Sequence, residues 1–512
     1  MTARAVGPGF VLGAVVLGVF AGEAVGPTPA RAAVVGAVGA FAAALVSAVT
    51  RRGIAGLALC CVAAALAGGA GMSRALDGLV HSPLTAAVGG RESATIDATL
   101  VTDPHATRFS ARVLARVGRV HLDSGPADGG GRTVAIDASG DAAPRLAVLA
   151  AGDGVRLVGY FRPLDPFEAR ERWRHAVGAF SADDLRAFSP PASPLLRVAN
   201  GLRARVLAGH RRVPEPQRAL LAGFLLGDTA DLPDSVVLDF RASGLSHLVA
   251  VSGENVAFVL ALVGPLLRRG PRAARLGIGL AVLVVFAAMT RWEPSVLRAS
   301  VMAACSMVAL AAGRPTAGLR ALALAVIGLL LVDPFLVHSV GFLLSCAASV
   351  GIAVVGPPIA ARIPGPRGLA EAVGVTAGAQ LAVAPVLVAV FGGVPLIAVP
   401  ANLVVAPFAG PLTVLGLVGG LVGEVVGGLG GGMVGSGVVG AVLSFPAYLC
   451  ATVVLAVARV AARTPMMLGA PQLVALGVVA SAGTFAVRRS RRATWPRART
   501  RSPESGLALP PR

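Results

Sequence analysis

The 512-residue sequence is 55% hydrophobic and only 14% charged, and its mean hydropathy is +0.76. Such values exclude a water-soluble globular protein of this size and indicate an integral membrane protein. The net charge of +19 comes from arginine alone, because the sequence contains no lysine. The arginines cluster in short segments between apolar runs and in the C-terminal tail, as the positive-inside rule produces. The basic balance therefore does not by itself indicate nucleic-acid binding.

Residues 1–72 are expected to form transmembrane helices. Three apolar runs lie near 9–25, 32–49 and 53–71, and each is close to the roughly 20 residues that cross a bilayer core. No convincing cleavage site follows the first run, so we expect a retained helix rather than a signal peptide. The Arg51–Arg52 pair places the loop after the second run in the cytoplasm. With a cytoplasmic N-terminus, three crossings leave the next segment outside.

Residues 73–170 are expected to form this extracytoplasmic segment, a small all-β domain. Turn-rich stretches such as "DSGPADGGG" separate short β-type runs, and the second run alternates apolar and polar residues as a half-buried strand does. These runs lie at 93–102, 108–117, 132–138 and 154–161. Several short strands spaced in this way suggest a barrel or sandwich, and a five-stranded OB-like closure is the natural candidate.

Residues 171–240 are expected to form an interfacial or amphipathic helical region. In "PLLRVANGLRARVLAGH" apolar residues such as Leu196, Leu202 and Val206 recur against Arg197 and Arg203 at helical spacing. This pattern fits either an amphipathic helix at the membrane interface or an ordinary surface helix.

Residues 241–488 are expected to form a second transmembrane domain, followed by an Arg-rich, disordered cytoplasmic tail at 489–512. Its apolar runs lie near 244–267, 273–290, 294–312, 317–332, 336–356, 369–391, 394–421, 433–458 and 466–487. With the first three runs they predict a polytopic α-helical protein of about twelve transmembrane helices with both termini in the cytoplasm. The arginine distribution is irregular across 394–463, where prolines and a Gly-rich run favour a re-entrant or broken segment.

Polar and ionisable groups inside apolar runs are costly and mark a pathway or a helix-packing network. The candidates are His247, Glu254, Asn255, Arg291, Glu293, Arg298, Asp333, His338, Gln380 and Asn402. If 245–267 is one helix, His247 and Glu254 lie two turns apart on one face, about 10 Å along the axis. That separation suits two groups that line one groove better than a catalytic pair.

The sequence does not favour an enzymatic role for these residues. Ser252 as a nucleophile with His247 as its base lacks the G-x-S-x-G elbow, and a spacing of five residues turns the two side chains apart on a helix. The seven histidines lack the spacing of a zinc site, and a P-loop is impossible without lysine. The five cysteines lie in apolar runs as small packing residues. A polar helix start and the lining of a translocation path both remain open for the segment around Ser252.

Three stretches resemble the ComEC family, the inner-membrane channel for DNA uptake in natural competence. They are "LLAGFLLGDTADLPDSVVLDFRASGLSHLVAVSGENVAFVLAL" (220–262), "PSVLRASVMA" (294–303) and "AQLAVAPVLVAVFGGVPLIAVPANLVVAPF" (379–408). The β-rich part is also similar to the N-terminal module of the family, with "ATLVTDP" at its start and "GDGVRLVGYFRPL" (152–164) at its end. The resemblance spans about 90 to 460, with its motifs in the expected order.

The resemblance implies a function. An OB-like external domain would receive single-stranded DNA, and the helical domain would carry it through the cell membrane into the cytoplasm. Implied partners are an extracytoplasmic DNA receptor, a separate nuclease and a cytoplasmic helicase or single-strand-binding protein, besides the lipid bilayer. Motif residues carried over without assigned chemistry are Gly227, Asp228, His247, Ser252, Gly253 and Asn255, and Glu254, Arg298, Gln380 and Asn402 complete the channel candidates.

The β-rich part also holds candidate DNA-binding arginines, because a strand of nucleic acid needs positive charge along its backbone and aromatic platforms for its bases. These are Arg108, Arg112, Arg116 and Arg156, with Arg119, Arg132 and Arg145 as further sources of charge. For each arginine alone, a solvated strand face is the competing explanation. Phe109, Tyr160 and Phe161 are nearly all the aromatics offered, with Phe109 a possible core residue, so we expect weak and salt-dependent binding.

The sequence departs from the family in two respects. It lacks the H-x-H-x-D-H zinc motif of the metallo-β-lactamase-like domain that many members carry, so we expect no nuclease activity, no metal and no cofactor. Glu254 stands where the family has a small, amide or aliphatic residue, and a carboxylate there would repel phosphates. The main rival function is a transporter or exporter of a small solute or lipid precursor, and a membrane scaffold is the third.

Overall fold

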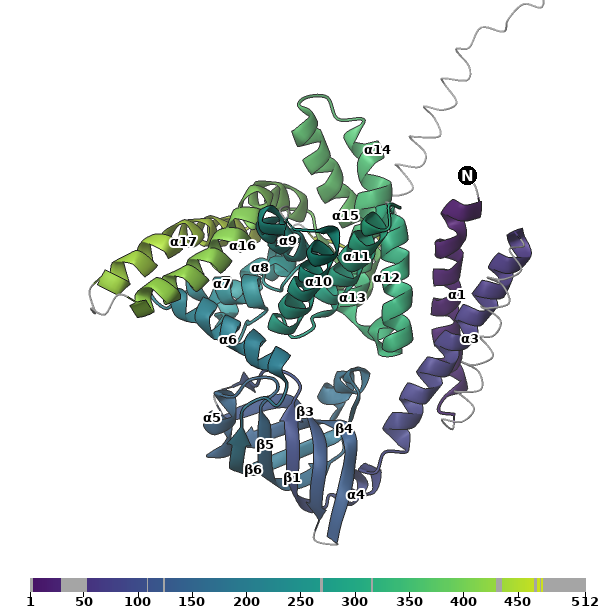
Figure 1. Ribbon diagram of the computed structural model, residues 1–512, viewed down its shortest axis with the longest axis vertical. Coiled ribbons are helices and arrows are strands. Elements are labelled where there is room, and N and C mark those ends of the chain that lie inside the picture. The colour runs from purple at the N-terminus through teal and green to yellow at the C-terminus, as the bar shows by residue number, and fades with distance from the viewer. Residues whose placement is uncertain are drawn as a thin grey trace, which may run out of the picture.

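The computed structural model of the protein describes residues 3–28, 53–107, 109–122, 125–267, 270–314, 316–429, 435–464, 467–469 and 471–472. The expected span at 32–49, Arg108, most of the last apolar run and the tail at 489–512 lie outside these residues. The described chain has two main parts, a β-barrel and a helical domain next to it, with a pair of N-terminal helices alongside (Figure 1).

Helices α1 (Ala3–Val25) and α3 (Gly53–Val80) form the N-terminal pair. They approach closely at small residues, since a Cβ atom at Gly18 would overlap the carbonyl oxygen of Ala65, and one at Gly22 would overlap that of Gly69. Close packing of this kind is typical of membrane helices, which gain little from the hydrophobic effect. A short helix, α4 (Thr85–Gly90), leads from α3 into the barrel.

The barrel is a closed sheet of five long strands. They are β1 (Ser93–Leu100), β3 (Ser110–Leu122), β4 (Gly125–Ser139), β5 (Gly154–Arg162) and β6 (Ala176–Ser189). The strand order is β1-β5-β6-β4-β3, and β1 pairs with β3 to close the barrel. All pairs are antiparallel except β4 with β6. The short strand β2 (His105–Ala106) pairs with β3, and α5 (Ala142–Ala147) connects β4 to β5.

Alternating apolar residues of all five strands fill the barrel. Ile96, Leu157, Phe161 and Phe180 are fully buried, and the last two rings meet edge to face at 5.0 Å. Phe109, considered for the core in the sequence, is instead 78% exposed. Phe161 is therefore part of the core and is not available as a platform for bases.

The fifth strand, β6, corrects the expectation of a helical region from residue 171 onward. The strand "AVGAFSADDLRAFS" is rich in Ala, Ser and Asp and poor in β-branched residues, so its sequence has a weak strand propensity. Its conformation is fixed by pairing with β5 and, in parallel, with β4, after the connection formed by the 3-10 helix η1 (Pro166–Arg174). The barrel consequently runs to Ser189.

The segment after the barrel is helical, as expected. It forms α6 (Pro194–Gly209), α7 (Gln217–Leu226) and α8 (Asp234–Ala242). Helix α6 packs against α10 and α16 of the helical domain. The side chain of Arg203, expected on a polar outer face, is only 7% exposed because it lies in this contact. Thus α6 joins the barrel to the helical domain and is not a free surface helix.

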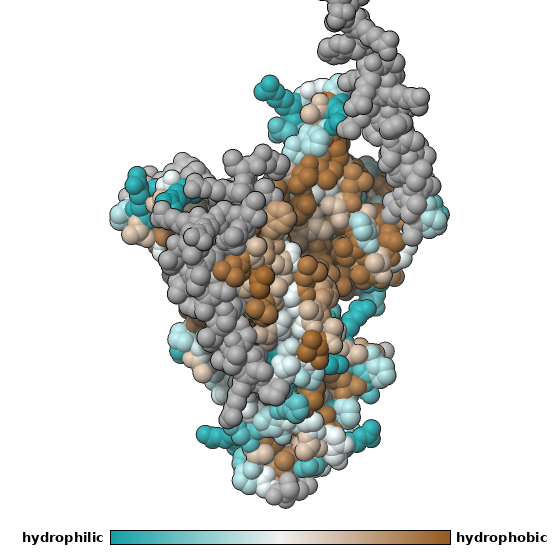
Figure 2. Space-filling view, turned by 90° about the vertical axis from the view of Figure 1, so that its right-hand side faces the viewer, coloured by the Kyte–Doolittle hydropathy of each residue, from teal (hydrophilic) through white to brown (hydrophobic). Residues whose placement is uncertain are grey.

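The helical domain continues with helices that are mostly long and apolar. Their bounds are α9 (Gly253–Leu267), α10 (Arg272–Met289), α11 (Pro294–Ala311), α12 (Gly318–Val332), α13 (Val340–Val350), α14 (Gly356–Ala360), α15 (Arg367–Phe391), α16 (Ala398–Leu429) and α17 (Gly435–Ala462). A π-helical turn, η4 (Gly351–Val355), joins α13 to α14. Within the described residues, eight helical segments are long and apolar enough to cross a membrane, and three apolar helices are shorter. Figure 2 shows apolar side chains gathered over this domain and more hydrophilic ones over the barrel.

Two expectations about these helices need correction. Residues 245–252 do not belong to the helix that follows, since Ser246–Leu248 form a separate 3-10 turn, η2, and α9 begins at Gly253. Helix α16 runs without interruption through Pro407 and Pro411, so the expected break does not occur at these prolines. The two-residue strands β7 (Val394–Pro395) and β8 (Met467–Leu468) pair just outside α16 and α17.

Candidate functional site

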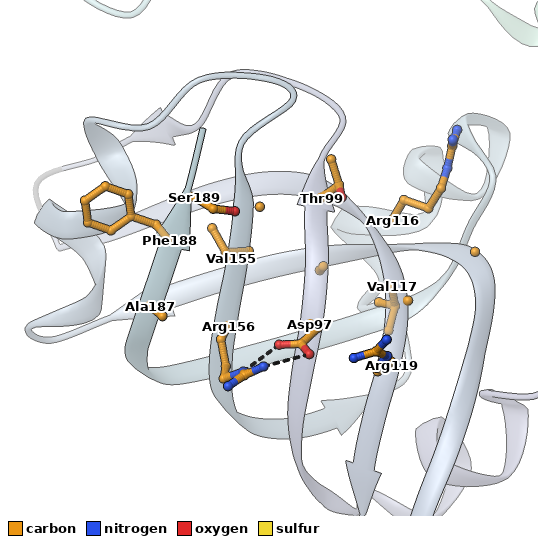
Figure 3. Close-up of a pocket in the computed structure, with 14 residues that line it drawn as sticks. Asp97, Thr99, Arg116, Val117, Arg119, Val155, Arg156, Ala187, Phe188 and Ser189 are labelled. Atoms are coloured by element: carbon orange, nitrogen blue, oxygen red, sulfur yellow. Dashed lines mark hydrogen bonds and ion pairs between the residues drawn. The ribbon is translucent and has the colours of Figure 1, made fainter. Parts of the chain in front are cut away.

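A groove of about 590 Å³ crosses the outer face of the barrel. Strands β1, β3, β5 and β6 contribute most of its lining, and Figure 3 shows Phe188 and Arg116 at opposite ends. Its side chains include Asp97, Thr99, Arg116, Arg119, Val155, Arg156, Phe188 and Ser189. The groove combines three arginines, one carboxylate and an aromatic ring that is 65% exposed. This combination of cationic groups and an accessible ring suits a single strand of nucleic acid.

Arg116 and Arg119 both face outward because of a β-bulge. In the pairing of β3 with β1, Ile96 lies opposite Val120 and Ala98 opposite Val117, so β3 has one extra residue, at Gly118–Arg119, opposite Asp97. A bulge changes the phase of the alternation, so two residues three positions apart point to the same side. Both side chains are exposed, and the described residues contain no ion pair of Arg116.

Arg156 differs from these two because it is paired. Its Nε and Nη2 donate to the carboxylate of Asp97 over 2.6 and 3.0 Å (Figure 3). The hydrogen bond from Arg156, helped by the charges of Arg156, His121 and Arg119, lowers the pKa of Asp97 against the effect of partial burial. The carboxylate stays ionised at neutral pH and offsets one of the three positive charges in the groove.

The predicted DNA-binding arginines therefore do not all lie in the groove. Arg116 and Arg156 lie in the groove, whereas Arg112 forms an ion pair with Asp137 at 3.3 Å and lies over the ring of Phe167 at 5.1 Å. Arg108 lies outside the described residues. Phe188 was missed because the sequence did not reveal β6, on which it lies.

A buried polar network holds the barrel on the helical domain. The carboxylate of Asp103, just after β1, accepts from Arg291 Nε at 2.8 Å and from Arg203 Nη2 at 2.8 Å, and it pairs with Arg291 Nη2 at 2.6 Å. Asp103 also accepts from the backbone N–H of Ala151 in the turn before β5. Asn200 of α6 completes the contact, because it accepts from Arg291 and donates to the carbonyl of Ala151. We call these residues, with Asp228, the Asp103 junction.

The charge balance of this junction is favourable. Arg203 is 7% exposed, yet it donates to the carbonyl oxygens of Leu226 and Met289 and lies 3.5 Å from the carboxylate of Asp228. Burial disfavours ionisation of Asp103, but the hydrogen bond from Arg291 and the charges of both arginines outweigh it, so the pKa of Asp103 lies below its usual value. Asp103 was not singled out in the sequence, although it belongs to the quoted "ATLVTDP". Two strand ends of the groove, at Thr99 and Gly154, lie within a few residues of Asp103 and Ala151 in the chain.

A second contact joins the barrel to η3 (Pro334–His338), the turn after α12. His175 lies 3.1 Å from Asp333, and the Trp173 ring stacks on His338 with a centroid distance of 3.8 Å. His338 in turn lies 3.2 Å from Glu23 at the end of α1. Asp333 and His338, candidates for a pathway, thus lie in a contact between the barrel and the helices.

Asn255, in the motif at 220–262, lies where three helices meet. Its side chain is 1% exposed, and its amide nitrogen donates to the carbonyl of Phe224 in α7 at 2.8 Å. Its oxygen accepts from Ser252 at 3.3 Å and from Thr413 of α16 at 3.4 Å. One amide therefore links α7, α9 and α16, which is a packing role.

Of the neighbouring motif residues, Gly227 and Asp228 have structural roles, and His247 and Glu254 are exposed. Gly227 ends α7 with a φ of +75°, a left-handed conformation that favours glycine. Asp228 belongs to the Asp103 junction. His247 and Glu254 are exposed, and since they lie on separate elements the sequence-based arrangement on one helical face is wrong.

Arg298 is the most unusual polar residue of the helical domain. It lies on α11, is 7% exposed, and donates to Ser345 at 2.8 Å and to the sulfur of Met302 at 2.8 Å. Gly253, the first residue of α9, packs directly against the Arg298 guanidinium. Gln380 and Asn402 are half-buried on α15 and α16, and the described part of the chain shows no hydrogen bond from either side chain.

The fold and this site define a polytopic membrane protein that carries a small β-barrel with a basic groove. A model of the family described as Competence protein matches residues 224–492, more than half of the chain. The protein belongs to this competence protein family. The match begins in α7 and includes the motif around Asn255, Arg298, Gln380 and Asn402.

Two curated proteins are similar to part of the chain. One is the uncharacterized protein YcaI of Escherichia coli strain K12, 26% identical over 235 residues, which are 42% of this chain and 30% of that protein. The other is ComE operon protein 3 of Bacillus subtilis strain 168, 26% identical over 238 residues, 46% of this chain and 30% of that protein. The chain thus spans about 30% of the length of these relatives. No solved structure matches it.

Proposed function

We propose that the protein takes part in DNA uptake during natural competence, as a channel that carries single-stranded DNA through the cell membrane into the cytoplasm. The observation that carries this proposal is the groove with Arg116, Arg119 and exposed Phe188 on a barrel that is fixed directly to the helical domain. Family membership supports it. The groove supplies backbone contacts, and the adjoining helices supply the route.

The proposal extends to the architecture. The closed order of five strands, a single parallel pair and a helix between β4 and β5 support an OB-like barrel. About twelve transmembrane helices with both termini in the cytoplasm would place this barrel outside, where it meets DNA. In this function the protein acts as a channel without catalysis, and a receptor, a nuclease and a cytoplasmic helicase or single-strand-binding protein would act beside it.

The test is binding of a labelled thymidine oligonucleotide to the full-length protein in nanodiscs, measured by fluorescence anisotropy over a range of salt. Each phosphate contact with a single strand contributes about 0.7 to the slope of log affinity against log salt. The double variant Arg116→Ala/Arg119→Ala should therefore lose about 1.4 in slope. Phe188→Ala should weaken binding by about five- to 100-fold at constant slope, because it removes only stacking.

Arg145→Ala is the matched control. Arg145 lies on α5, pairs with Asp184 at 3.4 Å, and is not part of the groove lining, but its loss changes the net charge equally per residue. It should leave both affinity and slope close to those of the wild type. Equal effects of Arg145→Ala and of either groove arginine would show that binding depends on net charge alone and would remove the support for this groove.

A further inference from the structure

The turn between α10 and α11 holds two large residues in an unfavourable backbone conformation. Arg291 and Trp292 have φ angles of +56° and +58°, in the left-handed region that glycine adopts most readily. The sequence contains 65 glycines, yet neither position in this turn is one of them. Residues held in this conformation cost stability and cluster where function requires their side chains. Both side chains therefore need an explanation beyond the turn itself.

Arg291 has such an explanation, and Trp292 has none within the protein. The guanidinium of Arg291 belongs to the Asp103 junction, where it contacts a carboxylate of the barrel. The backbone N–H of Trp292 donates to the carbonyl of Ala287 at 2.8 Å, which fixes the turn. Its side chain is 40% exposed, and in the described part of the chain the indole N–H has no hydrogen bond and the ring stacks on no other ring. A large ring held in this way is a typical contact surface for a ligand.

The turn lies between the two contacts that attach the barrel to the helical domain. On one side of Trp292, Arg291 bonds to Asp103, which follows β1 by three residues. On the other side, Glu293 reaches solvent, but burial by the surrounding protein raises its pKa, and the charge of Arg174 on η1 partly offsets this effect. Both neighbours of Trp292 thus face the barrel. The turn therefore lies at the passage from the barrel to the helices and not on the outer surface of the helical domain.

The groove ends close to this turn. Thr99 lines the groove near the end of β1, and Asp103 follows four residues later, so the two lie at most about 14 Å apart. Asp103 bonds to Arg291, the residue before Trp292. A strand that leaves this end of the groove can therefore bring its next bases to Trp292. Any base can stack on an aromatic ring, because every base has a π-face.

We propose that Trp292 is a stacking platform for bases of the single strand where it passes from the groove into the helical domain. This inference rests on the proposed function, because it takes single-stranded DNA as the ligand. Arg116 and Arg119 hold the backbone in the groove, and Trp292 holds a base beyond them. The fixed turn keeps the ring in place before the strand arrives, which reduces the entropy lost on binding. Tryptophan also contacts lipid headgroups at membrane interfaces, but the position between the two barrel contacts favours the strand.

The first experiment compares labelled thymidine oligonucleotides of about six and about 24 nucleotides on the full-length protein in nanodiscs of neutral lipid; the short strand occupies the groove, and the long one extends past it. Trp292→Ala should weaken the long strand about five- to 100-fold at an unchanged salt slope and leave the short strand unchanged. Trp292→Phe should keep most of the affinity. Trp292→Leu, which keeps apolar bulk without an aromatic ring, should behave like Trp292→Ala, and full affinity in this variant would overturn the proposal.

Two further variants separate stacking from folding and from the loss of any exposed ring. Trp292→Gly removes the backbone strain together with the ring, so it should bind the long strand as weakly as Trp292→Ala without a lower unfolding temperature. A lower unfolding temperature together with weaker binding of both strands would show that the ring only supports the fold. Phe445→Ala is the matched control, because it removes a ring on α17 that is 58% exposed, and it should change the affinity for neither strand.

Tryptophan fluorescence identifies what contacts the ring. Trp173→Phe/Trp495→Phe leaves Trp292 as the only tryptophan, because the sequence has three. The long strand should quench its emission more than the short strand does, and brominated lipid in the nanodisc should quench it little. Strong quenching by brominated lipid and none by the long strand would assign the ring to the membrane interface and overturn the inference.

The same measurements separate this inference from the proposed function. If Arg116→Ala/Arg119→Ala weakens both strands while Trp292→Ala changes neither, the groove binds DNA and Trp292 does not. If neither strand binds the wild type, the proposed function fails, and the inference about Trp292 fails with it.

Discussion

The Asp103 junction offers a sharp test of how the barrel is attached. Asp103→Asn keeps the shape of the side chain but removes the charge that faces Arg203 and Arg291. Removing one partner of a buried ion pair costs roughly 3–5 kcal/mol. Asp103 is 30% exposed and Arg203 retains Asp228 at 3.5 Å, so we expect a smaller loss of about 2 kcal/mol.

Asp97→Asn is the matched control. Asp97 also pairs with an arginine through two hydrogen bonds, but Arg156 is 53% exposed, and solvent screening leaves exposed pairs little effect on stability. The two variants therefore remove the same kind of contact in different surroundings. The expected difference between them is at least about 1 kcal/mol.

Hydrogen exchange followed by mass spectrometry on the protein in nanodiscs measures the effect locally. The peptide that includes Ala151, whose N–H donates to Asp103, should exchange about 30-fold faster in Asp103→Asn, since 1.4 kcal/mol corresponds to a factor of ten. In Asp97→Asn the same peptide should exchange within about fivefold of the wild type. Equal acceleration in both variants would refute the claim that burial of the junction determines its strength.

Three further predictions follow from the same contacts. The pKa of Asp103 is lowered in the folded protein, so the ionised carboxylate stabilises the contact between barrel and helices fully above about pH 4, and this stabilisation is lost as pH falls through the folded-state pKa. Pepsin should therefore cut between the barrel and α6 more readily as pH falls. Asp103→Asn should show no such dependence on pH. Asn255→Ala removes the hydrogen bond to the carbonyl of Phe224 and should lower both the unfolding temperature in detergent and DNA uptake. Ser246→Ala, at an exposed position, should change neither. Equal behaviour of the two variants would contradict the packing role of the Asn255 amide. Gly18→Val should separate α1 from α3, which a cysteine cross-link between these helices would report as a lost product, and a retained cross-link would argue against close packing there.

The membrane class, most helices and four barrel strands follow from periodicity and length, which are local properties of the sequence. Strand β6 does not, because its parallel partner β4 lies about 40 residues earlier and its own residues are poor strand formers. The start of α9 was also placed too early. The apolar run continues through "LVAV", yet Ser246–Leu248 form a separate turn and the helix starts at Gly253.

The site was predictable in part. Arg116 and Arg156 were among the arginines named as candidates for contacts with a DNA strand, and the structure places both in one groove. The role of Asp103 was not accessible, because its partners Arg203 and Arg291 lie 100 and 188 residues away in the sequence. Asn255 and Arg298 were both identified as polar residues within apolar runs. Only the structure shows that the amide of Asn255 is hydrogen-bonded to neighbouring helices, whereas Arg298 contacts a serine hydroxyl and a thioether but no carboxylate in the described residues.

The most direct test of the central claim is entry of labelled DNA into the cytoplasm of the native host, measured in a strain that lacks this protein and in the same strain complemented with the wild type or with Arg116→Ala/Arg119→Ala. We expect the deletion to abolish entry of single strands, the wild type to restore it, and the groove variant to restore only a fraction of it despite equal expression. Normal entry of single strands in the deletion strain, under conditions in which the host takes up DNA, would contradict the assignment of this protein as the channel.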